Sequence, residues 1–131
     1  MLIGVPSEIK EQEFRVGLTP NSVQELVNHG HKVLVQDSAG FGAGFNNAEY
    51  ESAGAKIVKD AGDIFNDVDM IVKVKEPLLN EAEMLRENQI LFTYLHLANA
   101  PELAKGLIKS KAVCIAYETV TDEDNRLPLL A

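Results

Sequence analysis

Residues 70–97 have the sequence MIVKVKEPLLNEAEMLRENQILFTYLHL, which places an amphipathic stretch between two short apolar runs. The runs Met70–Val74 and Ile90–Tyr94 are rich in branched or aromatic residues, which is typical of strands. Asn80 followed by Glu83 resembles a capping box, so a helix is predicted between the two strands. A strand, a helix and a strand in this order predict a right-handed crossover between parallel strands.

The same alternation extends over the whole chain. Further strands are predicted at Leu2–Val5, Val33–Gln36, Ile57–Val58 and Ala112–Ala116. Further helices are predicted to begin at Pro20 after a Thr19 cap, at Asn46 or Asn47, at Asp60 and at Pro101. The last helix should turn Leu103, Leu107 and Ile108 towards the sheet. We therefore predict a three-layer α/β fold with a mostly parallel sheet and helices on both faces, Rossmann-like but without a complete dinucleotide fingerprint.

The composition is that of one globular domain. The 131 residues suffice for one core, and 46% hydrophobic with 24% charged residues argue against a disordered chain. No apolar stretch approaches the ~20 residues of a membrane span, and Met1 leads straight into a strand. A formal charge of −8 disfavours a nucleic-acid surface. We therefore expect a cytoplasmic protein without membrane or nucleic-acid partners, in which Cys114 is a small buried apolar residue.

Four polar residues come shortly after predicted strands: Arg15, Lys75, His96 and Glu118. Ligands of parallel sheets bind beyond the carboxyl ends of the strands, where the connections diverge. These side chains should therefore gather at one edge of the sheet. Against the acidic background of the chain, Arg15, Lys73, Lys75 and His96 would favour a small anion.

Each of these residues also has a structural interpretation. Histidines that follow strands are more often hydrogen-bonded structural residues than catalysts, and His96 could be one of them. Alternation places Lys73 and Lys75 on one face, so at least one of them could be a solvated strand end. Three acids are candidates for a surface ion pair with Arg15: Glu8, Glu11 and Glu13.

Two weaker signals are interpreted as turns. The glycines of Gly40–Gly44 follow a strand, as in a dinucleotide-binding loop, but the third glycine of G-x-G-x-x-G would fall on Phe45. A mobile surface loop is the favoured interpretation. No metal site is predicted, because no histidine or cysteine accompanies the acidic run Asp122–Asp124 at ligand spacing.

Four blocks of sequence resemble one known family: Glu13–Pro20, Lys73–Pro77, Thr93–Ala98 and Ala116–Val120. In this order and at this spacing they are similar to the amino-terminal part of bacterial alanine dehydrogenases, whose family includes nicotinamide nucleotide transhydrogenases. The resemblance covers residues 1–131. Lys75 and His96 favour the dehydrogenases, because the transhydrogenase relatives usually lack both residues.

The resemblance implies NAD-linked interconversion of L-alanine and pyruvate. Arg15 would hold the substrate carboxylate through a bidentate grip. Lys75 would lie near the carboxylate and polarise the carbonyl, and His96 would act as general acid or base at the substrate oxygen. Tyr94 and Glu118 would hold these residues in place without contacting the substrate.

The resemblance also implies a domain arrangement. Residues 1–131 would be the amino-terminal segment of the substrate domain, and NAD would be bound mainly by a domain absent from this chain. The isolated chain is therefore expected to be inactive, and the full-length enzymes are expected to be homo-hexamers. Two other classes stay open: a stand-alone small-carboxylate binding module or transhydrogenase-like domain, and a structural fragment.

Overall fold

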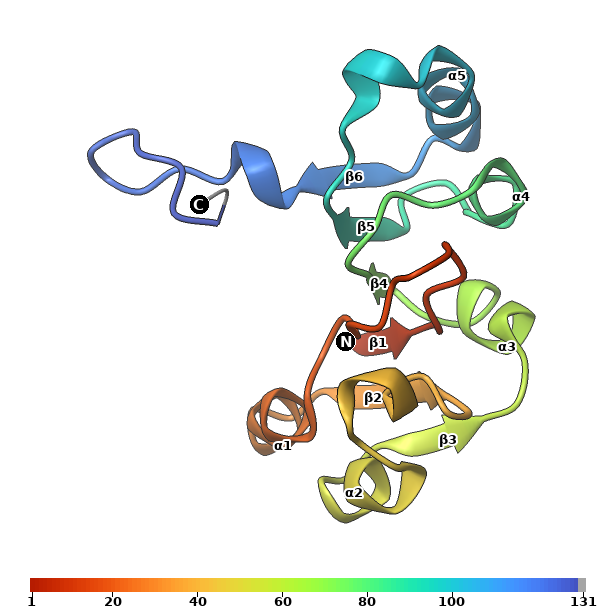
Figure 1. The fold of residues 1–131 in the computed structure, drawn as a ribbon, viewed down its shortest axis with the longest axis vertical. Helices are drawn as coiled ribbons and strands as arrows, with labels where there is room; N and C mark the ends of the chain where they lie inside the picture. Colours follow the sequence, from red (N-terminus) through yellow and green to blue (C-terminus); the bar gives the residue numbers. More distant parts are fainter. Residues whose placement is uncertain (130–131) are drawn as a thin grey trace.

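Six strands form a single sheet in the computed structural model, which describes residues 1–129. The strands are β1 (Leu2–Val5), β2 (Lys32–Gln36), β3 (Lys56–Val58), β4 (Met70–Val72), β5 (Ile90–Thr93) and β6 (Val113–Ala116). Their order is β3-β2-β1-β4-β5-β6, and every neighbouring pair is parallel (Figure 1). The predicted α/β fold is confirmed, and this sheet is parallel throughout.

Helices connect the strands as the sequence signals predicted. The α-helices are α1 (Pro20–Asn28), α2 (Asn47–Ser52), α3 (Ala61–Phe65), α4 (Leu79–Ala82) and α5 (Pro101–Ser110), and 3₁₀ turns lie at Phe41–Ala43, Leu97–Asn99 and Tyr117–Thr119. Pro20 is the first residue of α1, and the Thr19 hydroxyl accepts the N–H of Ser22 at 3.2 Å. The connection after β1 therefore ends at a well-defined helix start.

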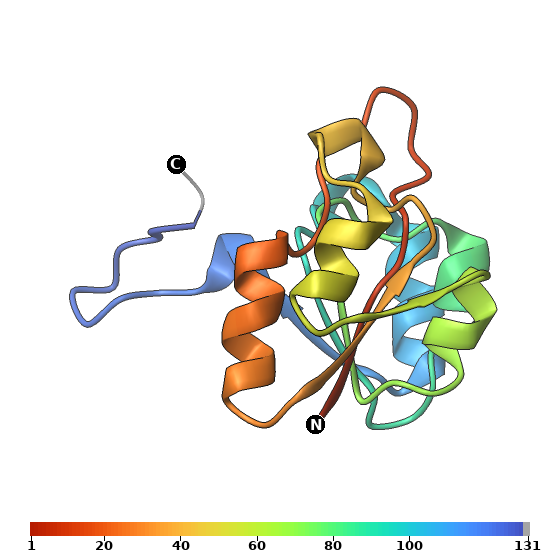
Figure 2. The ribbon, with the colours of Figure 1, turned by 90° about the horizontal axis from the view of Figure 1, so that it is seen from below.

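The helices cover the two faces of the sheet unequally. α1 and α2 pack on one face through Val23 and Tyr50, whereas α3, α4 and α5 pack on the other face (Figure 2). In β6, Cys114 packs on the α5 side, so its neighbours Val113 and Ile115 point to the opposite face, where they are 47% and 39% exposed. The face that carries α1 and α2 is thus incompletely covered at its β6 end.

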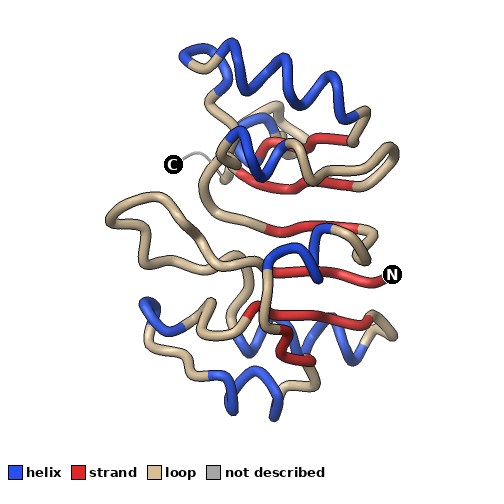
Figure 3. Tube along the Cα trace, turned by 90° about the vertical axis from the view of Figure 1, so that its right-hand side faces the viewer, coloured by secondary structure: helices blue, strands red, loops and turns tan. Residues whose placement is uncertain are grey.

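The carboxyl ends of all strands lie at one edge of the sheet, because the strands run in the same direction (Figure 3). The strand order reverses between β1 and β4. The connections that follow these two strands, residues 6–19 and 73–78, therefore lead to helices on opposite faces of the sheet, α1 and α4. We call this place the switch point.

The start of α4 differs from the prediction. Its first turn is closed by the carboxylate of Glu81, which accepts the N–H of Leu78 at 2.9 Å, and not by Glu83. The Asn80 side chain accepts the N–H of the adjacent Glu81 at 3.0 Å. The predicted pair of Asn80 and Glu83 is wrong because the helix begins two residues earlier than that pair requires, at Leu79.

Two predictions about side chains near α5 also need correction. Ile108 is 77% exposed and does not face the sheet, whereas Leu103 and Leu107 are buried. Residues four apart share a face of a helix, and the next residue is rotated away by about 100°. Cys114 is half-buried at the edge strand and not fully buried, although its burial still raises the pKa of the thiol.

Candidate active site

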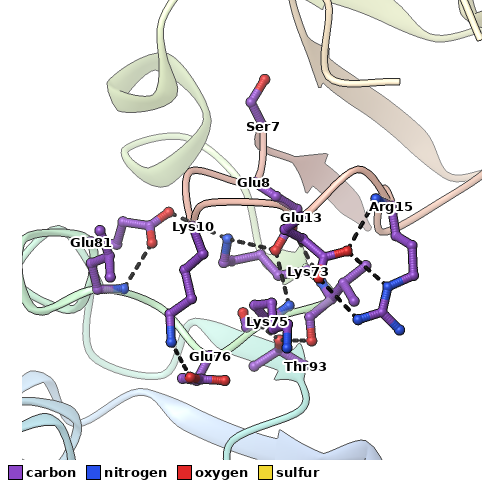
Figure 4. Close-up of polar contacts among 12 residues, drawn as sticks. Ser7, Glu8, Lys10, Glu13, Arg15, Lys73, Lys75, Glu76, Glu81 and Thr93 are labelled. Atoms are coloured by element: carbon purple, nitrogen blue, oxygen red, sulfur yellow. Dashed lines mark hydrogen bonds and ion pairs between the residues drawn. The ribbon is translucent and has the colours of Figure 1, made fainter. Parts of the chain in front are cut away.

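Arg15 lies on the connection from β1 to α1, where Glu13 holds its guanidinium (Figure 4). Nε donates to one oxygen of Glu13 at 2.8 Å, and Nη2 donates to the other at 3.0 Å. The Glu13 side chain is 5% exposed, whereas that of Arg15 is 63% exposed. The hydrogen bond between them lowers the pKa of Glu13 and raises that of Arg15. Glu13 is therefore the ion-pair partner, and Nη1 has no hydrogen-bond partner within residues 1–129.

Gly17 allows this connection to cross closely over the end of β4. A Cβ atom at this position would lie 2.4 Å from the carbonyl oxygen of Val72 and 2.9 Å from its carbonyl carbon. Real Cβ atoms do not approach so closely, and a backbone carbonyl cannot turn away as a flexible side chain can. The absence of a side chain at Gly17 therefore helps to place Arg15, two residues earlier, beside the end of β4.

We expect Gly17→Ala to destabilise the chain by about 1–3 kcal/mol, because the added methyl group overpacks a site where the backbone must move. Urea denaturation measures the effect. Gly62→Ala is the control, because a Cβ atom there meets no atom of residues 1–129 within 4 Å. That control should be neutral or slightly stabilising, since alanine is favoured in helices by about 0.5–1 kcal/mol. Equal stability of both variants would contradict the close crossing over β4.

Lys75 follows β4, and its backbone is held from two sides. The Glu8 carboxylate accepts the N–H groups of Val74 and Lys75 at 3.2 and 2.9 Å. The Thr93 hydroxyl lies 3.0 and 2.9 Å from the carbonyl oxygens of the same two residues, between which it shares its single proton. Because Glu8 takes up these N–H groups, β4 ends at Val72 and not at Val74 as predicted.

Lys73 and Lys75 have different environments despite their shared position in the alternation. Lys73 is not a solvated strand end, because it is 1% exposed and lies between two buried carboxylates, whereas Lys75 is partly exposed. Lys75 instead lies towards Arg15 and Glu13. The pKa of Glu13 is lowered chiefly by its hydrogen bond from Arg15, and the charge of Lys75 lowers it further.

His96 follows β5 with a left-handed backbone, at φ 47°. One oxygen of Glu118 accepts the N–H groups of Leu95 and His96 at 2.9 and 3.1 Å. The imidazole ring stacks on the ring of Tyr94, with 5.9 Å between centroids and 10° between planes. Glu118 thus ties the connection after β6 to the connection after β5 and fixes the backbone that carries His96.

The attachment of His96 should weaken in acid. Burial acts to raise the pKa of Glu118, but the N–H groups of His96 and Leu95 outweigh this and hold it below its ordinary value of 4.5. Because the pKa of Glu118 is lower in the folded state, its ionised carboxylate contributes fully to the stability of the fold above pH 4.5. This contribution is lost as the pH falls through the pKa of the folded state.

We therefore expect the amide resonances of Leu95 and His96 to shift together at a pH below 4.5 in an NMR titration of the chain. Glu118→Gln is the control and should abolish that shared transition, because its amide does not titrate. A transition at or above 4.5 would contradict the hydrogen bonds to Glu118.

A largely apolar cavity of about 400 Å³ opens beside these residues. Its lining comprises Arg15, Val16, Gly17, Thr19, Ala43, Phe45, Val74, Tyr94, Tyr117 and Leu129. Arg15 and Tyr94 therefore share one cavity, whereas Lys75 and His96 lie on the adjoining connections and do not line it. Glu118 lies behind His96 and contacts its backbone. Of the predicted site residues, the structure brings all five to one sheet edge but only two into the cavity wall.

Three residues at this edge were missed from the sequence: Glu8, Thr93 and Tyr117. Lys73 offered a signal for Glu8, because a lysine within an apolar run requires a buried acid if the side chain is enclosed. Tyr117 packs edge-on against Phe92 and Tyr94, with ring centroids 4.1 and 4.8 Å apart, and burial raises its pKa to about 12. Nothing in the sequence pattern distinguishes Tyr117 or Thr93 from ordinary strand-end residues.

The glycine-rich segment after β2 packs against the protein and does not form a phosphate cradle. A Cβ atom on Gly40 would lie 2.5 Å from the ring of Tyr50, and one on Gly42 would lie 3.2 Å from the backbone of Phe14. Gly40 and Gly42 are therefore packed against other parts of the chain. Within residues 1–129 there is no cluster of three or more side chains that would hold a metal ion, and no helix long and apolar enough to cross a membrane.

Comparison with known proteins identifies the family of the chain. The profile of the family described as Alanine dehydrogenase/PNT, N-terminal domain matches residues 4–131. The chain is 53% identical over 131 residues to the alanine dehydrogenase of Halomonas elongata, and 53% identical over 130 residues to that of Bacillus subtilis. These matches cover 100% and 99% of this chain but only 35% and 34% of the two relatives. The chain thus spans about a third of their length.

Solved structures give the same result. An L-alanine dehydrogenase superposes with a TM-score of 0.95 at 52% identity, over 99% of this chain and 36% of that protein. A transhydrogenase from Sinorhizobium meliloti superposes with a TM-score of 0.84 at 24% identity over 90% of this chain and 35% of that protein, which shows a common fold. The profile match and the identities together show that this chain belongs to the alanine dehydrogenase/PNT N-terminal domain family.

Proposed function

We propose that this chain is the substrate-binding domain of an NAD-dependent L-alanine dehydrogenase. Such an enzyme converts L-alanine, NAD⁺ and water to pyruvate, ammonium, NADH and a proton. The observation that carries the proposal is the position of Arg15, Lys75 and His96 on three connections at one sheet edge, on both sides of the switch point. The cationic side chains of Arg15 and Lys75 suit the carboxylate that both substrates contain.

Arg15 is proposed to bind the substrate carboxylate. Glu13 occupies the Nε side of the guanidinium, so the Nη1 side remains for a ligand. Arg15 also lines the cavity, whose volume of about 400 Å³ accommodates a three-carbon acid with room for a second group. A planar fork fixed along one side can grip a carboxylate along the other with little further loss of side-chain freedom.

Lys75, near the carboxylate, and His96 are proposed to act on the substrate carbonyl. The ammonium group of Lys75 would polarise the substrate carbonyl, which gains negative charge during the reaction. His96 would exchange a proton with the substrate oxygen, a role that imidazole side chains often fill in enzymes. Tyr94, stacked on the imidazole, and Glu118, bonded to its backbone N–H, are proposed to orient it.

NAD, when bound, supplies the hydride acceptor, and residues outside this chain are proposed to hold it. The length of the family relatives supports this division, because they are about three times as long as this chain. The apolar face at Val113 and Ile115 is also available to a further part of the polypeptide.

A chimera tests the proposal: residues 1–131 replace the matching segment of the Bacillus subtilis alanine dehydrogenase, to which this chain is 53% identical. We expect the chimera to oxidise NADH with pyruvate and ammonium. The purified 131-residue chain should show no turnover, because the substrate would lie in an open crevice without a positioned cofactor. Absorbance of NADH measures turnover, and light scattering tests the proposed homo-hexameric assembly.

The outcomes separate the alternatives. A folded chimera that binds pyruvate without turnover would favour a stand-alone carboxylate-binding module. A folded chimera without pyruvate binding would favour a structural fragment. Turnover by the 131-residue chain itself, absent from its His96→Ala variant, would contradict the division of the site between this chain and a further domain.

A further inference from the structure

Three charged side chains are buried together beneath the switch point: those of Glu8, Lys73 and Glu81, which are 3%, 1% and 5% exposed. They come from the connection after β1, the connection after β4 and helix α4. The Lys73 ammonium lies 3.4 Å from a carboxylate oxygen of each acid (Figure 4). Burial of such a group costs solvation that its internal attractions offset only in part, and apolar residues often stabilise a core equally well. Stability alone therefore does not account for this ion triad.

Glu8 differs from Glu81 in what its carboxylate holds. Both oxygens of Glu8 accept consecutive backbone N–H groups, that of Lys75 at 2.9 Å and that of Val74 at 3.2 Å. Glu81 accepts only the N–H of Leu78, at the start of α4. Glu8 therefore contacts the peptide that carries Lys75, and Glu81 does not.

The carbonyl groups of Val74 and Lys75, whose N–H groups Glu8 accepts, also contact a side chain. The Thr93 hydroxyl lies within 3.0 Å of the carbonyl oxygens of Val74 and Lys75. With N–H and C=O groups both taken up by side chains, the backbone at Lys75 has little freedom to rotate. An ion pair between Lys10 and Glu76 ties the same two connections together at their outer side.

We propose that Glu8 is a positioning residue that sets the backbone of Lys75 at the switch point, and that Lys73 is the buried cation that holds the Glu8 carboxylate in place. The proposal rests on the proposed role of Lys75 in substrate binding. It assigns different tasks to two lysines that are two residues apart. Lys73 points into the core and holds the Glu8 carboxylate in place. Lys75 is the residue proposed to contact the substrate, and Glu8 sets the position of its backbone.

Glu8→Gln and Glu81→Gln form a matched pair of variants. Each removes one of the two carboxylates and leaves the other paired with Lys73, so each keeps one buried Lys–Glu pair. Only Glu8→Gln affects the N–H groups of Val74 and Lys75, because the glutamine amide has one accepting oxygen where the carboxylate has two. Glu8→Asp is a third variant that keeps the charge but is one methylene too short to reach both N–H groups.

Amide hydrogen exchange in the 131-residue chain gives a direct measurement of position. In Glu8→Gln and Glu8→Asp, we expect exchange at Val74 and Lys75 to accelerate at least tenfold more than exchange at Leu91, a fully buried strand residue. In Glu81→Gln, exchange at Val74 and Lys75 should change no more than at Leu91. Equal acceleration in the Glu8 and Glu81 variants would overturn the proposal and make the triad merely structural.

Kinetics in the chimera provide the second measurement. Glu8→Gln should raise KM for pyruvate about tenfold or lower kcat by a similar factor, with KM for NADH unchanged, whereas Glu81→Gln should affect only the melting temperature. If the parent chimera does not turn over pyruvate, the proposed function fails, but the exchange experiment still decides whether Glu8 positions Lys75. Accelerated exchange with normal pyruvate kinetics would overturn the link between that position and substrate binding.

Discussion

Replacement of His96 by alanine in the chimera is expected to lower turnover by roughly 10²–10⁴, the usual contribution of a positioned acid or base. One limb of the pH–rate profile should change as well, because the proton that the imidazole exchanges would have to come from solvent. Stopped-flow absorbance of NADH across roughly pH 6–10 measures both effects. The binding of NADH should be unaffected.

A second variant separates chemistry from backbone conformation. His96 has a φ of 47°, which disfavours alanine, whereas asparagine adopts this left-handed region readily. His96→Asn should therefore lose turnover like His96→Ala but retain the melting temperature of the parent. His29→Ala, at the exposed end of α1, is the control and should leave turnover unchanged. Normal turnover in His96→Asn would remove His96 from the chemistry and leave it a structural residue.

Arg15→Lys in the chimera is expected to raise KM for pyruvate on the order of a hundredfold, because loss of a charge-assisted pair typically costs a few kcal/mol. Lysine keeps the charge but lacks the planar fork, so it cannot both bond Glu13 along one side and grip a carboxylate along the other. KM for NADH should stay close to that of the parent. Initial rates with varied pyruvate and saturating ammonium and NADH measure the change.

Arg126→Lys is the matched control for this experiment. Arg126 is also exposed and also bonds nearby acids, Asp122 and Asp124, but it lies on the segment after β6 and does not line the cavity. Its substitution should not change KM for pyruvate. An unchanged KM in Arg15→Lys would show that the guanidinium serves only its pair with Glu13.

The order of elements and the edge that carries the polar residues could be predicted because both depend on local pattern. Strand runs, the Thr19 cap and Pro20 are signals within a few residues of one another, and a parallel sheet places every strand end at the same edge. The prediction of side-chain burial failed where contacts with residues distant in the sequence determine that burial. Alternation treats Lys73 and Lys75 alike, and only the approach of Glu8, 65 positions before Lys73, buries one of them.

The common sheet edge of the candidate residues could be predicted, but the directions of their side chains could not. The sequence placed Arg15, Lys75, His96 and Glu118 after different strands, and the structure confirms their common edge. The sequence could not show that Arg15 and Tyr94 line one cavity while Lys75 lies beside it. The direction of side chains at irregular strand ends follows no periodic pattern. The roles of these residues stay predictions until the chimera is tested.

The central position of β1 has a consequence during synthesis on the ribosome. β1 is made first, yet one of its two neighbours, β4, begins at Met70, and Glu8 lies 67 positions before the lysine whose N–H it accepts. At translation rates of about 5–20 residues per second, β4 is synthesised roughly 3–13 s after β1. Until then β1 can pair only with β2, and Glu8 remains hydrated. The contacts at the switch point thus form late, after residue 75 has emerged.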